Sequence, residues 1–258
     1  TQLQVKSLLA GTNAQSIVEF ETIPYISIDA DSTAIERLSA SGLVHQIIKE
    51  NVLRPLLAQS VPHIGAPAAW AAGYDGTNQT VAVLDTGVDK SHPFLAGKVV
   101  SEACYSLSGG INVPLCPNGV VSNGISSQTS SGAATPCTVE YCLHGTHVAG
   151  IAAGSGITFS GVAKGAKIIA IQVFHKVTDN DICTTSGFSG APCVLSSDSE
   201  ILKALERVYQ LRSTYSIAAV NLSLGGGRFG GYCDQSFPYY YSMFEQLRSV
   251  GIAVVAGT

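Results

Sequence analysis

Four short apolar runs recur along the later part of this chain, and a helical pattern follows each of the first three. The apolar runs are Thr80–Leu84, Ala166–Phe174, Ile217–Leu224 and Gly251–Ala256. The helical stretches between them are Gly145–Gly154, Asp198–Arg212 and Tyr239–Val250. Strands that are apolar on both sides need cover on both faces, and strands joined through helices run parallel. The patterns therefore predict an α/β protein whose parallel sheet carries helices on both faces.

The first part of the chain differs from the rest, because it has no cysteine, few glycines and more charge. Its patterns predict a helix near Gln4–Leu9, one or two strands within Gln15–Asp29, a helix over Ser32–Ala40 and a strand over Leu43–Val52. We therefore expect a small α+β module over residues 1–57, followed by the α/β domain over residues 58–258.

Composition restricts the class of partner. Hydrophobic residues make up 46% of the chain and charged residues 12%, which is enough apolar surface for one large core. The 14 basic and 18 acidic residues give a formal charge of −4, which favours neither nucleic acid nor an anionic membrane as partner. No apolar run approaches the roughly 20 residues of a membrane-spanning helix. We therefore expect no nucleic-acid and no membrane partner.

The seven cysteines all follow Asp85, and none of them forms a CxxC pair, so zinc and redox sites are disfavoured. Most lie in two long polar segments, Ser106–Thr138 and Lys176–Ser197, which are predicted to be surface loops held by disulfides. Disulfides favour a secreted or extracellular protein, with the periplasm as the alternative compartment. The odd number predicts one free thiol or a partner outside the chain, and the pairing stays open, as does the alternative of reduced, buried cysteines.

Two residues at element ends are candidates for catalysis. Asp85 ends an apolar strand and is followed by Gly87, and His144 begins a helix rich in small residues. Ligand sites of parallel sheets lie at the carboxyl ends of the strands, where Asp85 is expected. A carboxylate placed there can orient an imidazole, which then acts as general base for a nucleophile. We therefore predict Asp85 and His144 as a catalytic pair.

Other interpretations of these residues are weaker. Asp85-Thr86-Gly87 is also the signature of aspartic peptidases, but that chemistry needs two such carboxylates and the chain has one. His144 and His147 are three residues apart with no glutamate between them, unlike a zinc-binding HExxH helix. No metal site is predicted, and His147 is expected in the core or in support of His144.

The remaining polar motifs are predicted to be structural. Ser189, in GFSGAP, is predicted to be a loop serine, and the glycine-rich segment 225–231 lacks the Lys-Ser/Thr of a phosphate loop. Four more histidines belong to no constellation and are expected in surface positions or loops: His45, His63, His92 and His175.

Four segments, in the order VAVLDTGVD, HGTHVAGI, NLSLGG and GIAVVAG, resemble the subtilisin-like serine peptidases. The resemblance covers roughly residues 58–258, and the first two segments together are highly specific. Residues 1–57 resemble the C-terminal part of the family's inhibitory propeptide.

The resemblance implies roles for individual residues. Asp85 would orient the imidazole, and His144 would serve as general base and acid. Ser223, Leu224, Gly225 and Gly226 would form the edge that pairs with the main chain of a substrate. The bond between Leu57 and Ala58 would be the propeptide cleavage site.

The chain also departs from the family. No segment resembles the family's GTSMA motif, so the nucleophilic serine and the oxyanion-hole asparagine are expected beyond Thr258. The chain is thus predicted to be incomplete and not competent alone. Phe94 stands where family members with the strong calcium site have an aspartate, and Ser155–Lys164 carries no carboxylate, so that site is expected to be absent. A different structural calcium site would use Asp179, Asp181 or Asp198; catalysis itself is expected to need no cofactor.

The function implied by the resemblance is a serine endopeptidase that hydrolyses peptide bonds of proteins. Its expected partners are protein or peptide substrates, its own propeptide and the missing C-terminal segment. The alternative is an inactive protein of the same fold that binds or inhibits through its peptide-pairing strand.

Overall fold

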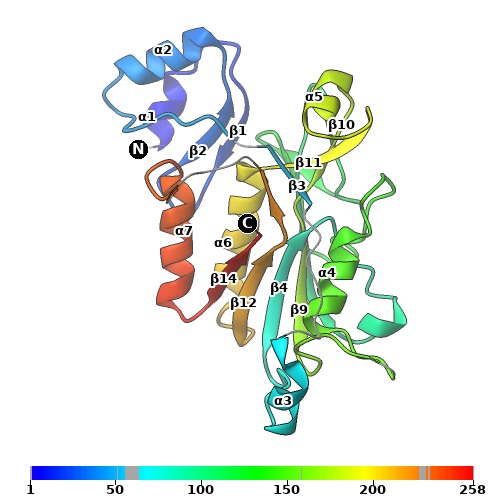
Figure 1. Cartoon of the computed structure of the whole chain (residues 1–258). Coiled ribbons are helices and arrows are strands. Elements are labelled where there is room, and N and C mark those ends of the chain that lie inside the picture. The colour runs from blue at the N-terminus through cyan, green and yellow to red at the C-terminus, as the bar shows by residue number, and fades with distance from the viewer. Residues whose placement is uncertain are drawn as a thin grey trace.

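We describe the protein from a computed structural model, which places residues 2–50, 52–55, 64–157, 159–226, 231 and 233–257; residues 52–55 are described by their backbone. A seven-stranded sheet of order β14-β12-β4-β9-β5-β8-β7 forms its centre (Figure 1). The strands are β4 (Thr80–Asp85), β5 (Val99–Leu107), β7 (Val120–Ser122), β8 (Ile125–Gln128), β9 (Lys167–Gln172), β12 (Ile217–Leu222) and β14 (Ala253–Ala256).

Five neighbouring strands of this sheet, from β14 to β5, run parallel, and β8 and β7 continue it antiparallel at one edge. The predicted parallel sheet is therefore confirmed, with an edge that the sequence patterns do not predict. Strand β5 is not predicted because its apolar pattern is interrupted by Ser101, Glu102 and Ser106. The segment Ser106–Thr138, predicted to be a surface loop, contains the hairpin β7–β8, because its strands obtain their partner from β5.

Helices cover both faces, as predicted. In β4, Ala82 and Leu84 belong to the hydrophobic cluster that includes α6 and α7, whereas Val83 packs in a second cluster with α4. This alternation is what a strand buried on both sides requires. The helices are α3 (Ala66–Ala71), the 3₁₀ helix η2 (Pro93–Leu95), α4 (His144–Ala153), α5 (Asn180–Thr185), α6 (Asp198–Leu211) and α7 (Pro238–Ser249).

A second sheet, of five strands, has the order β13-β3-β11-β10-β6. It consists of β3 (Val52–Pro55), β6 (Asn112–Pro114), β10 (His175–Val177), β11 (Cys193–Ser197) and β13 (Leu224–Gly225). The segment Lys176–Ser197 is therefore not only a surface loop, because it contains part of β10 as well as α5 and β11. Strand β3, from the N-terminal part of the chain, lies antiparallel to both of its neighbours, β11 and β13.

The N-terminal part folds as a small module of α1 (Gln2–Ser7), β1 (Gln15–Glu19), β2 (Ile26–Asp29) and α2 (Ser32–Ala40). The predicted strand Leu43–Val52 is wrong, because residues 43–50 contain no strand and β3 begins only at Val52. Leu43 and Ile47 are exposed and have no neighbouring strand, whereas β3 meets two strands with which it can form hydrogen bonds.

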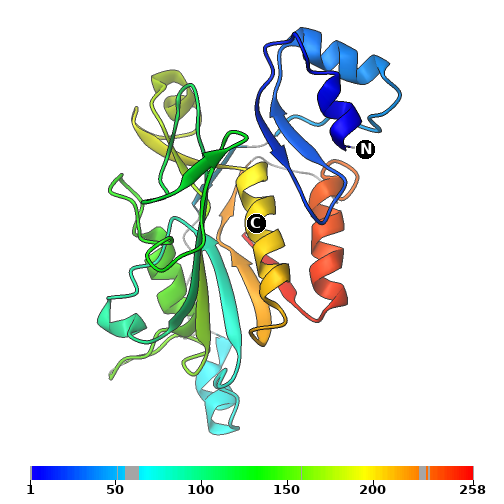
Figure 2. The same ribbon diagram turned by 180° about the vertical axis from the view of Figure 1, so that it is seen from behind.

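The module packs on α6 and α7 (Figure 2). Phe20 and Ile23 belong to the same hydrophobic cluster as these helices, and the Tyr25 ring meets the Tyr239 ring edge-on with 6.0 Å between centroids. The carboxylate of Glu206, on α6, accepts hydrogen bonds from the backbone N–H and the hydroxyl of Thr22, at 2.8 and 3.1 Å. Apolar contact and partly buried hydrogen bonds thus both hold the module in place.

Glu50 makes a further contact of this interface. Its carboxylate accepts hydrogen bonds from the backbone N–H of Ser199, at the start of α6, and from the hydroxyl of Ser27. Burial raises the pKa of Glu50 to about 6 from 4.5, and the nearby Asp198 carboxylate adds to the rise. Asp198 itself accepts hydrogen bonds from the hydroxyls of Tyr239 and Tyr240.

We expect the packing of the module on α6 to weaken as the pH rises. The docked Glu50 carboxyl holds its proton more firmly than a free one, so its contribution is complete below pH 4.5 and is lost as the pH passes about 6. The free energy that Glu50 contributes to this packing should fall by about 1–2 kcal/mol over this pH range. Hydrogen exchange of the β1 and β2 amides between pH 4 and 8 measures it. Glu50→Gln should remove the pH dependence and the exposed control Glu36→Gln should keep it; an unchanged profile in Glu50→Gln contradicts the assignment.

Six of the seven cysteines form disulfides, which confirms the expectation from their number and placement. The pairs are Cys104–Cys116, Cys137–Cys142 and Cys183–Cys193. Cys233 has no disulfide partner among the residues that the structure describes.

Within the described part of the chain, no helix combines the length and the apolar character needed to cross a bilayer.

Candidate active site

Asp85, the last residue of β4, and His144, the first residue of α4, lie in direct contact. The Nδ1 atom of His144 is 2.8 Å from Oδ1 and 3.0 Å from Oδ2 of Asp85. Both residues are buried, with exposed fractions of 0% for Asp85 and 7% for His144. An ionised carboxylate can only accept hydrogen bonds, so Nδ1 carries the hydrogen and Nε2 is the basic nitrogen. This arrangement suits a histidine that removes a proton from a nucleophile.

The residue next to Asp85 explains how strand and helix are fixed to one another. The hydroxyl of Thr86 donates to the carbonyl of Cys142 at 3.0 Å and accepts from the backbone N–H of Gly145 at 3.0 Å. The backbone N–H of Thr86 also donates to Asp85 Oδ1 at 2.7 Å. The sequence patterns do not identify Thr86 as part of the site. Its position between Asp85 and Gly87 is the feature from which a role beside the aspartate could have been predicted.

Two glycines allow the close approach of β4 and α4. Gly87 has a φ of 101°, a left-handed conformation that side chains disfavour. A Cβ atom on Gly145 would lie 2.2 Å from the carbonyl oxygen of Gly87 and 2.9 Å from the Cβ atom of Asp85. Only glycine therefore fits after His144, because any side chain would push the helix away from Asp85.

The predicted substrate edge lies at the same end of the sheet. Strand β12 pairs in parallel with β4, and Asn221 is opposite Val83. Ser223, which follows β12, therefore lies near Asp85 at the carboxyl ends of these two strands. Ser223 is buried, and its hydroxyl accepts a hydrogen bond from the side-chain amide of Asn221 at 2.9 Å. Next come Leu224 and Gly225, which form β13, and then Gly226, which is exposed.

The edge is already paired with a segment of the chain itself. In the ladder, Leu224 is opposite Pro55 and Gly225 is opposite Arg54. On the other side of β3, Leu53 is opposite Ser196 and Val52 is opposite Ser197 of β11. An extended segment thus lies between two strands: β13, which contains part of the predicted substrate edge, and β11, which the sequence patterns do not predict. The predicted cleavage site, Leu57 and Ala58, lies outside the described residues.

Two of the three carboxylates considered for calcium, those of Asp179 and Asp198, have other partners. Asp179 caps α5 by accepting the backbone N–H of Ile182, and Asp198 accepts the two tyrosine hydroxyls. Among the residues that the structure describes, no group of three or more His, Cys, Asp or Glu side chains is arranged to hold a metal ion. The ring of Phe94 packs against the backbone at Gly154 and against the ring of Phe159.

Two of the histidine predictions are wrong. His147 is exposed, because Val148 and Ala149 carry the buried side of α4 at that point. His175, for which the sequence predicts a surface position or a loop, lies in β10 and is 3% exposed; its Nδ1 atom lies 3.0 Å from Oε2 of Glu200. The partner of His175 is 25 residues away along the chain, so no local pattern indicates the contact.

Comparison with known proteins gives a consistent result. A family model described as the subtilase family, Peptidase_S8, matches residues 76–237. The chain is 39% identical over 138 residues to bacillopeptidase F and 35% identical over 126 residues to the minor extracellular protease Vpr, both of Bacillus subtilis (strain 168). These matches cover 52% and 49% of the chain but only 9% and 14% of the two relatives.

The fold is also found among solved structures. Fervidolysin from Fervidobacterium pennivorans, described as a keratinolytic enzyme related to subtilisin, superimposes with a TM-score of 0.62. The match has 20% sequence identity and covers 99% of the chain and 38% of the fervidolysin chain. At this identity the likeness concerns the fold alone, and it includes the N-terminal module.

Proposed function

Because the chain belongs to the subtilase family, we propose that it carries most of the catalytic domain of a serine endopeptidase that hydrolyses peptide bonds of proteins. The observation that carries this proposal is the buried contact between Asp85 and His144 Nδ1 at the carboxyl end of the sheet. The alternative, an inactive peptide-binding protein, is not favoured, since both residues of the pair are in place.

In the proposed mechanism, Nε2 of His144 removes the proton from a serine hydroxyl as its oxygen attacks the carbonyl carbon of the substrate. The proton then passes to the leaving amine, and water repeats the sequence on the acyl-enzyme. Asp85 holds the imidazole in place and stabilises its positive charge. We propose that the serine, and the oxyanion-hole asparagine, belong to a segment of the protein beyond Thr258. The mechanism needs no cofactor, and the usual strong calcium site is proposed to be absent.

We further propose that residues 1–57 are an inhibitory propeptide. Strand β3 occupies the space between β11 and β13 in antiparallel pairing, as an extended substrate would. The packing of the module on α6 supports a tight complex. In this proposal the enzyme is a zymogen until the chain is cut at Leu57–Ala58 and the module leaves.

Secretion is proposed from two observations. Three disulfides form in the structure, and disulfides persist in oxidising compartments. One relative is named an extracellular protease. Protein substrates outside the cell are therefore the proposed partners.

Labelling with a fluorophosphonate tests the proposed function. The full-length protein is treated with the reagent after removal of the N-terminal module, and the labelled peptide is identified by mass spectrometry. We expect the label on a serine in a segment outside this chain, and no label in a His144→Ala variant. A full-length protein that takes up no label and cleaves no unfolded protein would overturn the proposal.

A further inference from the structure

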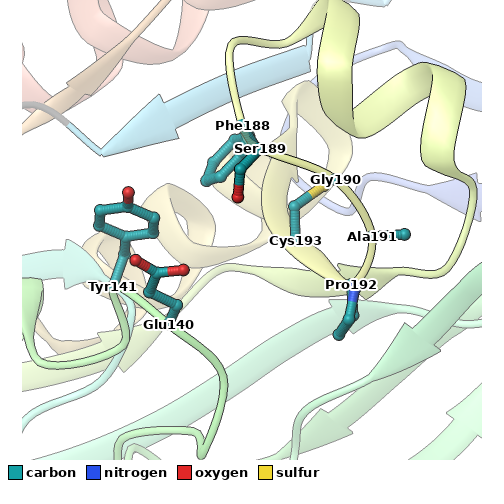
Figure 3. A pocket seen from close by; sticks show the side chains of 8 residues that line it. All are labelled: Glu140, Tyr141, Phe188, Ser189, Gly190, Ala191, Pro192 and Cys193. Carbon is teal, nitrogen blue, oxygen red and sulfur yellow. The ribbon is translucent and has the colours of Figure 1, made fainter.

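A pocket of about 280 Å³ opens between the turn before α4 and the loop before β11. Figure 3 shows Glu140 and Tyr141 on one side of it and Phe188 and Ser189 on the other, with the Glu140 carboxylate directed into the space between them. Cys193, at the start of β11, also lines it. Its volume is just below the range of about 300–1,000 Å³ typical of whole small-molecule ligands, so it suits a single side chain.

The two walls are each closed by a disulfide. Cys137–Cys142 closes the turn that carries Glu140 and Tyr141, and Cys183–Cys193 closes the loop that carries Phe188 and Ser189. The rings of Tyr141 and Phe188 meet edge-on with 5.6 Å between centroids. The pocket is therefore formed before any ligand arrives, which lowers the entropic cost of binding.

The chemistry of the pocket fits a cation. Glu140 is the only charged residue among the described residues that line it, and within the described part of the chain it forms no ion pair. Aromatic rings beside a carboxylate attract an ammonium or a guanidinium group through its charge and its apolar stem. A lysine or arginine side chain therefore complements both the charge and the rings.

The pocket lies on the path of a polypeptide paired with β11. In the observed ladder, Val52 is opposite Ser197 and Leu53 is opposite Ser196, so a chain in this direction advances toward Cys193. On the opposite wall, the carbonyl of Tyr141 accepts the backbone N–H of His144 at 3.0 Å. A side chain that enters the pocket therefore belongs to a residue near the bond that His144 would help to cut.

We propose that this pocket selects a lysine or arginine side chain of the substrate, close to the bond that is cut. The proposal rests on the proposed peptidase function and names the class of substrate. Glu140 acts here as a specificity-determining residue and takes no part in bond breaking.

The test uses the full-length enzyme freed of its N-terminal module, with peptides that carry lysine or its uncharged analogue norleucine at each of the four positions before the cut. The fourth position corresponds to Arg54, the basic residue nearest to the proposed cut at Leu57–Ala58. At one position we expect kcat/KM to be about ten-fold higher for lysine. Glu140→Gln should reduce this ratio to about two-fold or less, and Glu140→Lys should reverse it in favour of norleucine. Asp181→Asn, which makes the same charge change on α5 outside the pocket, should leave the ratio unchanged.

The outcomes separate this proposal from the proposed function. If the enzyme cuts peptides but the lysine preference is absent, or is the same in Glu140→Gln, the pocket proposal is overturned and the peptidase function stands. If no peptide is cut, the peptidase function fails, and the pocket is tested by fluorescence anisotropy with the same peptides and the His144→Ala protein. Tighter binding of lysine peptides that depends on Glu140 then supports the pocket, and equal binding overturns it.

Discussion

Replacing His144 with alanine in the full-length protein is expected to lower kcat for peptide hydrolysis by about 10⁶-fold, the loss seen when the base of a comparable triad is removed. The reason is that no other group then takes the serine proton. Asp85→Asn should cost about 10⁴-fold, because the amide no longer holds the imidazole with its hydrogen on Nδ1. Hydrolysis of a chromogenic peptide under saturating substrate measures both.

The matched control for these variants is His147→Ala. His147 is on the same helix, three residues along, but is exposed, so its removal should leave kcat within about two-fold of the wild type. Circular dichroism should show that all three variants are folded. A His144→Ala protein that keeps activity within ten-fold of the wild type would contradict the assignment of the base.

The sequence predicts the central part of this molecule well, because the decisive signals are local. The apolar run of β4 ends in Asp85, and the small residues after His144 allow α4 to approach the sheet. The glycines at 87 and 145 can be interpreted in the same way, because each is needed at a close contact between neighbouring backbone segments. The strands of a parallel sheet are apolar throughout, which makes them the easiest elements to recognise.

The elements that the sequence does not predict depend on distant partners. Strand β3 forms at Val52 because β11 and β13 are there to accept it, and nothing in the segment itself distinguishes it from residues 43–50. Strand β11 is a second edge of the proposed peptide-binding region, yet it lies in a segment that resembles a disulfide-closed loop. Propensity alone does not identify such strands, because pairing decides whether they form.

The same dependence on distant partners makes Glu200 a sensitive position. Glu200 is completely buried in the first turn of α6, and its carboxylate accepts the backbone N–H groups of Leu107 and Ser197, each at 2.7 Å. The Nδ1 atom of His175, which donates its hydrogen, lies at 3.0 Å. One side chain thus joins β5, β10 and the end of β11 to α6.

We expect Glu200→Ala to lower the free energy of unfolding by about 3–5 kcal/mol, because it leaves two buried N–H groups and His175 without their acceptor. Glu200→Gln should cost less, since the amide oxygen still accepts. Urea denaturation of the full-length protein measures both. The control is Glu245→Ala, where an exposed glutamate is paired with Arg248, and it should cost less than about 0.5 kcal/mol.

Replacing Glu200 should also weaken the binding of a peptide in the proposed substrate region. Ser197, which Glu200 holds, is opposite Val52 in the ladder with β3, so a displaced Ser197 weakens pairing with an extended peptide. The contact between Asp85 and His144 does not involve Glu200. Glu200→Gln, the milder variant, should therefore raise KM for a peptide substrate by more than it lowers kcat. Equal losses of stability in Glu200→Ala and Glu245→Ala, or an effect of Glu200→Gln on kcat alone, would show that the carboxylate does not hold this edge.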